Sequence, residues 1–453
     1  MHITATPLVR VSAPKGHRIL GFLRQIRRDR LGLFLRLARE HGDFVQIDLG
    51  RIGRSRLFLL SHPTLIEEVL VIGNRSFRKD FTLRSLRREL GNGLLLSEGD
   101  FWKRQRRLVQ PAFHRERVAG YGGTMVQLTR EIADGWRDGE VLDIHHAMME
   151  LALRIVAKTL FDVESRAENA VIGRAVALSQ RRFTRKTNTG FLIPDAWPTP
   201  TNVRFERAMR RLDAFILGII ADRRAAPGDR GDLLSLLLGA QDDDGARMTD
   251  QQLLDEVKTL FLAGHETTTN LMTWTWKLLA EHPDVAARLR AELDATLAGR
   301  DPQPADLPTL PYTQQVIAEA LRLYPPAWIV PREAIAPCTI GGQPIEPGDG
   351  VFVSPWVVHR DGRFFAEPER FLPERWTPEF RRQLPAYAYF PFGGGQRKCV
   401  GEAFALMEAH LILATIARRV SWTLVPQPPI GLDPSVTLRP SRPVLLRAAI
   451  AAG

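Results

Sequence analysis

The chain has 453 residues, of which 44% are hydrophobic and 25% charged, so it is long enough to bury a large core. Its formal net charge of +11 raises binding to nucleic acid or membranes as an option, but the basic residues are spread among 51 acidic ones and form no polybasic tail, which favours a solvated surface. Two cysteines are too few for a disulfide framework and are typical of a reducing compartment. We therefore expect a cytoplasmic protein that does not bind nucleic acid.

The amino-terminal part alternates short apolar segments with basic residues. No run of ~18 apolar residues occurs in the first thirty, so we expect neither a signal peptide nor a membrane anchor. Residues 31–39 predict a helix packed on the core, with a membrane-surface helix as the less favoured alternative. Residues 44–49 and 56–60 predict two strands, joined by a glycine-containing turn at 50–53. Residues 77–100 predict a loop.

The middle of the chain is predicted to be mostly helical. Residues 101–107 form a charged segment in which Trp102 and Arg106 stand one turn apart on a helix face. The segment from Thr189 to Asn202 is rich in proline and aromatic residues and predicts a loop. Two further helical stretches are expected at residues 123–160 and 167–184. Two further loops are expected at residues 225–231 and 242–246.

The longest predicted helix begins with a capping box. Thr249 and Gln252 can each satisfy an early backbone amide, and the pattern then continues to Glu281, where Pro283 stops it. Roughly 32 residues would span about 48 Å at 1.5 Å per residue. Its charged residues exclude a membrane span.

The centre of this helix reads Ala-Gly-His-Glu-Thr-Thr over residues 263–268. A glycine there costs roughly 1 kcal/mol relative to alanine, and threonines are poor helix formers, so stability does not explain the segment. Considered alone, the Thr267 hydroxyl would be expected to donate to the carbonyl one turn earlier. His265 is expected to be a bystander or part of a pocket wall.

Residues 392–401, Phe-Gly-Gly-Gly-Gln-Arg-Lys-Cys-Val-Gly, predict a tight loop that presents a cysteine. Three glycines suggest a turn or the close approach of a flat group. Arg397 and Lys398 would lower the pKa of Cys399, which lies just before a predicted helix. Such a thiolate could be a nucleophile, a metal ligand or a haem ligand. A phosphate-binding loop is excluded because its lysine must be followed by a hydroxyl residue, whereas Lys398 is followed by cysteine. A structural zinc site is disfavoured because it needs about four Cys or His ligands at short spacings, and Cys338 is the only other cysteine in the sequence.

The ordered set Phe392, Gly395, Arg397, Cys399 and Gly401 resembles the haem-binding loop of the cytochrome P450 superfamily. The resemblance extends from about Phe44 to Arg419. It implies a mainly α fold with a minor β part, a triangular helical prism with small sheets. It also implies one domain over residues 1–453 without a fused reductase, and one heme b whose iron is bound by Cys399. Phe392 and Arg397 would contact this cofactor.

Further segments resemble other motifs of the family. Glu266 and Thr267 would be the acid–alcohol pair that delivers protons to dioxygen, with small residues beside them leaving room for oxygen and substrate. Trp102, Arg106 and Arg332 would contact the haem propionates. Glu319, Arg322 and Arg375 would form a structural charge network that holds the cysteine loop.

The resemblance implies a monooxygenase, an oxidoreductase of bacterial, soluble type that inserts one oxygen atom of dioxygen into an apolar molecule, namely a fatty acid, terpenoid or steroid. By position, pocket residues would be Leu95, Phe191, Trp197, Ala263, Trp328 and Ile329. The segment 189–202 would be the mobile lid. An enzyme that uses peroxide and a non-catalytic haem sensor or carrier remain as alternatives, with a non-haem cysteine hydrolase a distant third.

Electrons are expected from a separate ferredoxin or flavodoxin with its reductase. Basic residues predicted to gather on the cysteine side would attract such an acidic partner, namely Lys103, Arg104, Arg107, Arg397 and Lys398. We expect a monomer.

Overall fold

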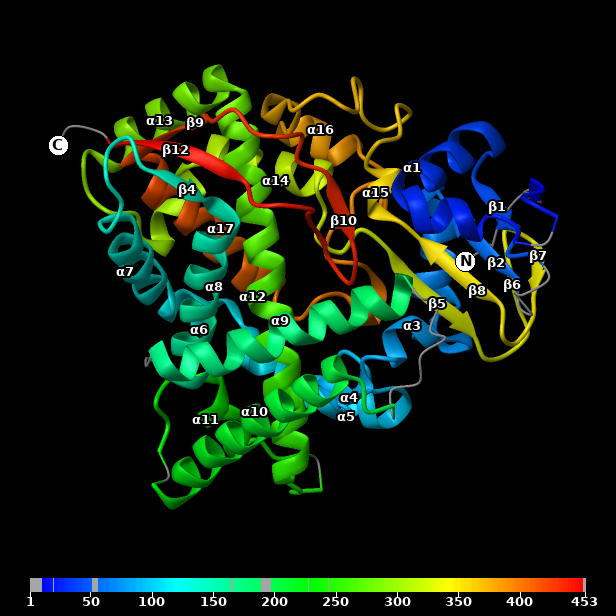
Figure 1. Ribbon diagram of the computed structural model, residues 1–453, viewed down its shortest axis with the longest axis horizontal. Coiled ribbons are helices and arrows are strands. Elements are labelled where there is room, and N and C mark those ends of the chain that lie inside the picture. The colour runs from blue at the N-terminus through cyan, green and yellow to red at the C-terminus, as the bar shows by residue number, and fades with distance from the viewer. Residues whose placement is uncertain are drawn as a thin grey trace. The chain divides into compact units, whose positions relative to one another are not determined.

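The computed structural model describes residues 10–18, 20–50, 56–163, 166–188, 197–226, 228–242 and 244–450, with backbone alone at 166–170 and 187–188. The chain divides into two compact units. Unit 1 comprises residues 1–85 and 321–399, and unit 2 comprises residues 86–320 and 400–453. Their elements are labelled in Figure 1.

Unit 1 is built on a five-stranded sheet of order β1-β2-β8-β5-β3. β2 and β8 are parallel, and the other neighbours are antiparallel. The bounds of its strands, with those of a separate β6–β7 hairpin, are β1 Phe44–Ile47, β2 Leu57–Leu60, β3 Phe77–Arg78, β5 Val330–Ala334, β6 Cys338–Ile340, β7 Gln343–Ile345 and β8 Gly350–Val353.

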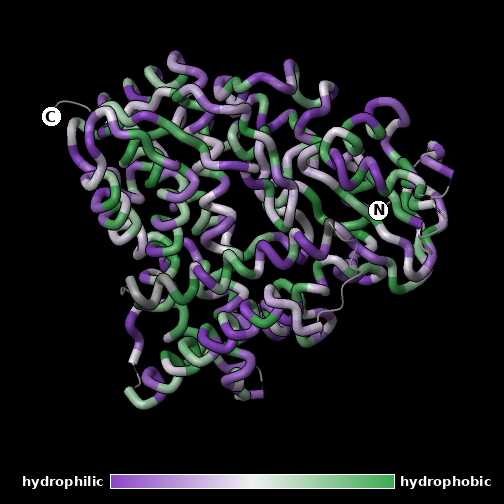
Figure 2. Tube along the Cα trace, viewed as in Figure 1, coloured by the Kyte–Doolittle hydropathy of each residue, from purple (hydrophilic) through white to green (hydrophobic). Residues whose placement is uncertain are grey.

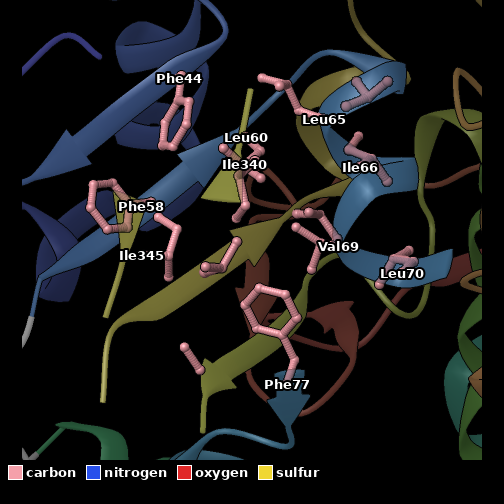
Figure 3. Close-up of a cluster of buried hydrophobic side chains, with 14 of the residues drawn as sticks. Phe44, Phe58, Leu60, Leu65, Ile66, Val69, Leu70, Phe77, Ile340 and Ile345 are labelled. Atoms are coloured by element: carbon pink, nitrogen blue, oxygen red, sulfur yellow. The ribbon is translucent and has the colours of Figure 1, made fainter. Parts of the chain in front are cut away.

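The core of unit 1 lies where this sheet meets two consecutive helical segments. Side chains from the sheet, such as Phe44 and Phe58, belong to one buried cluster with Leu65, Ile66 and Val69 (Figure 3). Burying such side chains contributes roughly 1.5–3 kcal/mol each. The helical elements of unit 1 are α1 Leu23–His41, α2 Pro63–Glu67, η1 Glu68–Ile72, η2 Asn74–Ser76, α3 Phe81–Arg84, α15 Pro355–Val358, η5 Pro373–Arg375, α16 Pro378–Gln383 and η6 Gly395–Arg397.

Unit 2 is organised around α12, Asp250–Glu281, whose amino-terminal end has the predicted capping box, with Thr249 as the N-cap and Gln252 as the third residue of the helix. Its strands and remaining helical elements are α4 Arg87–Leu90, α5 Gly99–Val109, η3 Gln110–Phe113, α6 Arg115–Gly120, α7 Gly122–Ala133, β4 Val141–Asp143, α8 Ile144–Phe161, α9 Arg166–Asn188, α10 Pro200–Ala225, α11 Leu233–Gly239, α13 Pro283–Leu297, η4 Pro304–Thr309, α17 Glu402–Ala417, β9 Val420–Leu424, β10 Leu432–Pro434, β11 Leu438–Pro440 and β12 Leu445–Ile450. Helix α14 is Pro311–Leu323, of which residues 311–320 are assigned to unit 2 and residues 321–323 to unit 1.

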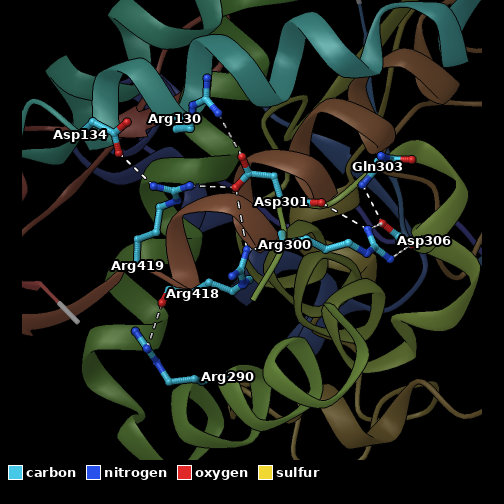
Figure 4. Close-up of polar contacts among 9 residues, drawn as sticks. All are labelled: Arg130, Asp134, Arg290, Arg300, Asp301, Gln303, Asp306, Arg418 and Arg419. Carbon is cyan, nitrogen blue, oxygen red and sulfur yellow. Dashed lines mark hydrogen bonds and ion pairs between the residues drawn. The ribbon is translucent and has the colours of Figure 1, made fainter. Parts of the chain in front are cut away.

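An ionic cluster joins three parts of unit 2 near the carboxyl end of α17 (Figure 4). Arg419 donates to Asp301, after α13, at 2.8 Å and to Asp134, after α7, at 2.9 Å. Arg130 of α7 also pairs with Asp301, at 3.5 Å. Partly exposed pairs of this kind contribute ~0–1 kcal/mol each, so the cluster adds only modestly to the stability of the fold.

The predicted fold class, mainly α with small sheets, is confirmed, and two element predictions were wrong. The single helix expected at 123–160 is two helices, α7 and α8, because Gly139 has a positive φ of 75° and β4 then pairs with β12. The loop expected at 77–100 contains β3 and the short helices α3 and α4. The other predicted helices and strands are present with modest shifts of their ends, while most of the turn at 50–53 lies outside the described residues.

Hydrophilic and hydrophobic residues alternate throughout the trace (Figure 2). Over the described part of the chain, every helix falls short of the length or the apolar character needed to cross a bilayer.

Candidate functional site

In unit 1, the cysteine loop is closed by its own backbone. The Cys399 amide donates to the Phe392 carbonyl at 3.0 Å, and the Lys398 amide donates to the Gly395 carbonyl at 3.1 Å. Cys399 is exposed, and α17 begins three residues later at Glu402. The loop therefore presents the cysteine side chain outward, just before a helix, as the sequence predicts.

The chain itself accounts for the three glycines of this loop. Gly393 and Gly395 have φ values of +70° and +62°, in the left-handed region. A Cβ at Gly395 would overlap the carbonyl oxygen of Leu70 in η1, and one at Gly394 would overlap the ring of Tyr387. The close approach inferred from the sequence is thus made to η1 and to an aromatic ring of unit 1.

Two arginines of the predicted network hold the segment that precedes the cysteine loop. Arg322, fully buried at the end of α14, donates to the carbonyls of His359 at 2.8 Å and Arg370 at 3.0 Å. Arg375 donates to the carbonyl of Ala366 at 2.6 Å. Glu319 is buried one turn before Arg322. These arginines therefore stabilise the backbone of residues 359–370 through charge-assisted hydrogen bonds.

The predicted residues around β5 differ in their exposure. Arg332 is 7% exposed, and its Nη1 donates to the Pro331 carbonyl at 3.0 Å. Trp328 is 3% exposed, with its ring centroid 6.2 Å from that of Phe34 in α1, so it packs in the core of unit 1. Ile329 is half-buried. Of this group, Arg332 is a buried cation, which requires hydrogen-bonding or anionic partners.

In unit 2, α12 has one uncovered patch. Every residue between Leu253 and Trp276 is buried except Leu262, Ala263, Gly264 and Thr267, and Ala263 is the exposed one. Ala263 and Thr267 lie one turn apart and therefore on one face. Both belong to the sequence motif at 263–268, so the patch coincides with the predicted active centre.

The small residues of this motif serve different purposes. A Cβ on Gly264 would lie 3.1 Å from Cγ2 of Val156 in α8, so this glycine allows α8 and α12 to pack closely. Both Ala263 and Gly264 were expected to leave room for oxygen and substrate. Of the two, Ala263 is exposed and suits that purpose. The Thr267 hydroxyl donates to the Ala263 carbonyl at 2.8 Å, the local bond expected for an isolated threonine. His265 is buried, with Nδ1 2.7 Å from the Phe261 carbonyl oxygen.

Glu266 is 5% exposed and is bound by a residue that the sequence did not suggest. Its Oε1 accepts a hydrogen bond from Thr437 Oγ1 at 2.6 Å, and Thr437 accepts one from Asn270 Nδ2 at 3.0 Å. Thr437 lies in the turn between β10 and β11, 171 residues along the chain from Glu266. Such a contact depends on the tertiary fold and leaves no local signal.

A second buried carboxyl lies close to the motif. Glu408 of α17 is fully buried and accepts from Thr268 Oγ1 at 2.9 Å. Burial raises the pKa of Glu408 to about 8, against the opposing effect of the Thr268 hydrogen bond. A glutamate inside the apolar run of α17 was a signal in the sequence that could have revealed this residue.

The amino-terminal half of α12 binds the segment that contains Leu95. Asp255 Oδ2 accepts from the Asn92 amide at 2.8 Å, and Glu256 Oε2 accepts from the Leu94 amide at 2.9 Å. Burial, opposed by the Leu94 hydrogen bond and assisted by Asp255, raises the pKa of Glu256 to about 7. Leu95 itself is half-buried. This part of unit 2 is therefore fixed directly to α12.

The other predicted residues of unit 2 are distributed as follows. Trp102 on α5 is 7% exposed, and Arg106, one turn later, donates to Gln110 at 3.2 Å. Trp197 is 60% exposed. Phe191 lies outside the described residues, as does most of the predicted lid.

The family model described as "Cytochrome P450" matches residues 11–447. The chain belongs to the cytochrome P450 family. "Cyclooctatin synthase" of Streptomyces melanosporofaciens is 40% identical over 419 residues, 90% of each chain. "Pentalenene oxygenase" of Streptomyces avermitilis is 34% identical over 448 residues, 97% of each chain. Among solved structures, the heme domain of cytochrome P450DA matches with a TM-score of 0.88 at 28% identity, covering 98% of this chain and 99% of that one.

This P450 is therefore an oxidoreductase related to bacterial oxygenases, as the sequence predicts. Family and fold imply a haem-thiolate cofactor. Within unit 1, the residues present suit such a group, because an exposed cysteine can supply a thiolate ligand and the buried Arg332 supplies a cation suited to a carboxylate.

Proposed function

We propose that this P450 is a haem-thiolate monooxygenase that uses one heme b, with the Cys399 thiolate as the iron ligand. The observation that carries the proposal is the uncovered patch of Ala263 and Thr267 in the middle of an otherwise buried helix. The exposed Ala263 and half-buried Thr267 leave part of that face accessible to a small molecule. Trp102, Arg106 and Arg332 are proposed to bind the propionates, and Phe392 and Arg397 to contact the haem.

The proposed reaction consumes one substrate molecule RH, one dioxygen, two electrons and two protons, and it yields ROH and water. When bound, the haem supplies the chemistry of dioxygen reduction. The chain supplies the proton path. Glu266 would carry a proton on its carboxylate, and the Thr267 hydroxyl, at the uncovered patch, would pass it on.

The proposed substrate is an apolar terpenoid. Of the three classes considered, namely fatty acids, terpenoids and steroids, this is the one that the names of the relatives favour. Two relatives are named for reactions of pentalenene and cyclooctat-9-en-7-ol. Leu95 and Ala263, both in unit 2, offer apolar surface to such a molecule, whereas Trp328 packs against Phe34 and is a less suitable contact. Binding would be measured as a spin-state shift with one terpenoid alcohol, one fatty acid and one steroid at equal concentrations.

We further propose that a separate ferredoxin or flavodoxin, with its reductase, supplies the electrons, and that the protein is a cytoplasmic monomer of one domain. Lys103 and Arg107 are exposed on α5 and suit an acidic partner, as does Lys398 on the cysteine loop. Arg104, expected in the same set, instead pairs with Asp242 at 2.6 Å and is a poorer candidate. The low cysteine content supports a reducing compartment.

The deciding experiment is the carbon monoxide difference spectrum of the dithionite-reduced protein. Wild type and Cys338→Ser, which changes the other cysteine, are expected to show the strongly red-shifted Soret band of a thiolate-ligated haem. Cys399→Ser is expected to lose it. An absent haem, or a band that survives Cys399→Ser, would overturn the proposed function.

A further inference from the structure

The hairpin of β10 and β11 lies beside α9 in unit 2 (Figure 1), and side-chain hydrogen bonds join the two. Arg439 of β11 donates through Nη1 to Gln180 Oε1 at 3.0 Å and through Nη2 to Thr184 Oγ1 at 3.1 Å. The hydroxyl oxygens of Ser435 and Thr184 lie 3.1 Å apart. Side chains at both ends of the hairpin turn therefore contact α9.

The same hairpin is hydrogen-bonded to α12. Besides the bond from Thr437 to Glu266, Trp274 Nε1 donates to the Leu438 carbonyl at 3.2 Å. Because Asn270 donates to Thr437 Oγ1, the single hydroxyl proton of Thr437 is left to point at Glu266 Oε1. Glu266, Asn270 and Thr437 are each at most 7% exposed, so this arrangement is shielded from water.

The hairpin is braced internally by its backbone ladder and by one side-chain hydrogen bond. Leu432 pairs with Pro440 and Pro434 with Leu438 in an antiparallel ladder. Arg439 Nε donates to Asp433 Oδ2 at 2.8 Å. Only Leu438 separates the arginine that contacts α9 from the threonine that contacts Glu266.

We propose that Thr437 is a positioning residue that retains the carboxylate of Glu266, and that the β10–β11 hairpin makes this retention depend on the position of α9. The proposal rests on the proposed role of Glu266 as a proton carrier. Successive residues of a helix point about 100° apart, and Thr267 is bonded to the Ala263 carbonyl. Glu266 must therefore leave Thr437 before it can serve the uncovered patch, and a shift of α9 acts on that bond through Arg439.

Coupling between two sites is reciprocal, so loosening Glu266 must also loosen α9. Hydrogen–deuterium exchange of the holoprotein, without turnover, measures this for peptides from 166–188. Thr437→Val is expected to speed exchange in α9 severalfold, whereas Thr437→Ser, which keeps the hydroxyl, stays near wild type. Thr275→Val is the matched control, because Thr275 is buried on α12 and its hydroxyl bonds to Leu271 of its own helix at 2.8 Å. If Thr437→Val exchanges no faster than Thr275→Val, the proposal is overturned.

Turnover supplies the second readout. The measured quantity is the fraction of donated electrons that is recovered in product. When Thr437 is present, Arg439→Gln is expected to change this fraction severalfold. When Thr437 is replaced by valine, Arg439→Gln is expected to have little effect on it. Equal effects in both backgrounds would overturn the coupling. The carbon monoxide spectrum of the same proteins separates the two proposals: a normal band with unchanged exchange overturns only the hairpin proposal, and a missing band in wild type overturns the proposed function.

Discussion

Gly395 meets two independent constraints in the loop that carries Cys399, a left-handed backbone and contact with the Leu70 carbonyl. Gly393 meets only the first, since nothing lies within 4 Å of the place where its Cβ would be. The pair therefore separates the cost of the backbone conformation from the cost of the overlap. A left-handed conformation costs a non-glycine residue about 1–2 kcal/mol.

We expect Gly393→Ala to lower the free energy of unfolding by about 1–2 kcal/mol. Gly395→Ala should lower it by clearly more, because η1 must also move away from the loop. Chemical denaturation of both variants, followed by far-ultraviolet circular dichroism, compares the two. The expectation fails if the two alanine variants are equally stable.

Glu408 gives the stability of the protein a dependence on pH. Its pKa is about 8 in the folded state against an ordinary value of 4.5, so the folded protein binds more protons than the unfolded chain between these values. Stability is therefore greatest below about pH 4.5, as far as this residue is concerned, and it is lost as the pH rises towards 8. The slope is at most ~1.4 kcal/mol per pH unit.

Glu408→Gln keeps the site neutral at every pH, so the variant should gain thermal stability relative to wild type progressively from pH 5 to pH 8. Midpoints of thermal unfolding at ~0.5-unit steps of pH measure this difference, since 1 kcal/mol corresponds to roughly 1 °C in a chain of 453 residues. Glu150→Gln, on an exposed part of α8, is the control and should differ little from wild type at any pH. A Glu408→Gln variant whose advantage does not grow with pH would contradict the assignment.

At the scale of elements, Gly264 controls how closely α8 and α12 pack. Alanine is favoured over glycine inside a helix by roughly 1 kcal/mol. In the wild-type background, however, the added methyl would press on Val156, a fully buried side chain. These two effects oppose each other and can be separated with a second substitution.

In a Val156→Ala background, Gly264→Ala should stabilise the protein by roughly 1 kcal/mol, because the opposing methyl groups are gone. In wild type the same change should be less favourable by at least ~0.5 kcal/mol, the lower end of coupling energies between residues in contact. Denaturation of all four proteins closes the cycle. Additive effects would show that α8 does not constrain Gly264.

Elements with strong local signals were predictable, and contacts between distant segments were not. The capping box of Thr249 and Gln252 and the stop at Pro283 fixed α12 from the sequence alone. The break between α7 and α8 was missed because β4 depends on pairing with β12, about 300 residues later. The contact of Thr437 with Glu266 was missed for the same reason, whereas the cysteine loop was predictable because its residues are consecutive in the sequence.

At the scale of the whole molecule, the net charge of +11 favours encounters with acidic partners. Many of the arginines are engaged within the chain, as Arg104 is with Asp242 and Arg419 with Asp301. The charge that an acidic partner meets is therefore smaller than the sequence total, and it includes exposed side chains such as Lys103 and Arg107. Although Lys103 pairs with Asp100 at 2.7 Å, both side chains are more than half exposed, and pairs of that kind are weak.

We expect the double variant Lys103→Glu/Arg107→Glu to slow reduction by an acidic ferredoxin at least tenfold at low salt, because charge complementarity acts chiefly on the rate of association. The difference from wild type should shrink as ionic strength rises and the Debye length falls to ~10 Å at 0.1 M. Stopped-flow reduction measures the rate, and spin-state titration with substrate should give unchanged affinity. Arg381→Glu/Arg382→Glu, on α16, makes the same change of net charge at another pair of basic residues. If this control slows reduction equally, net charge alone guides the partner and α5 is not its docking site.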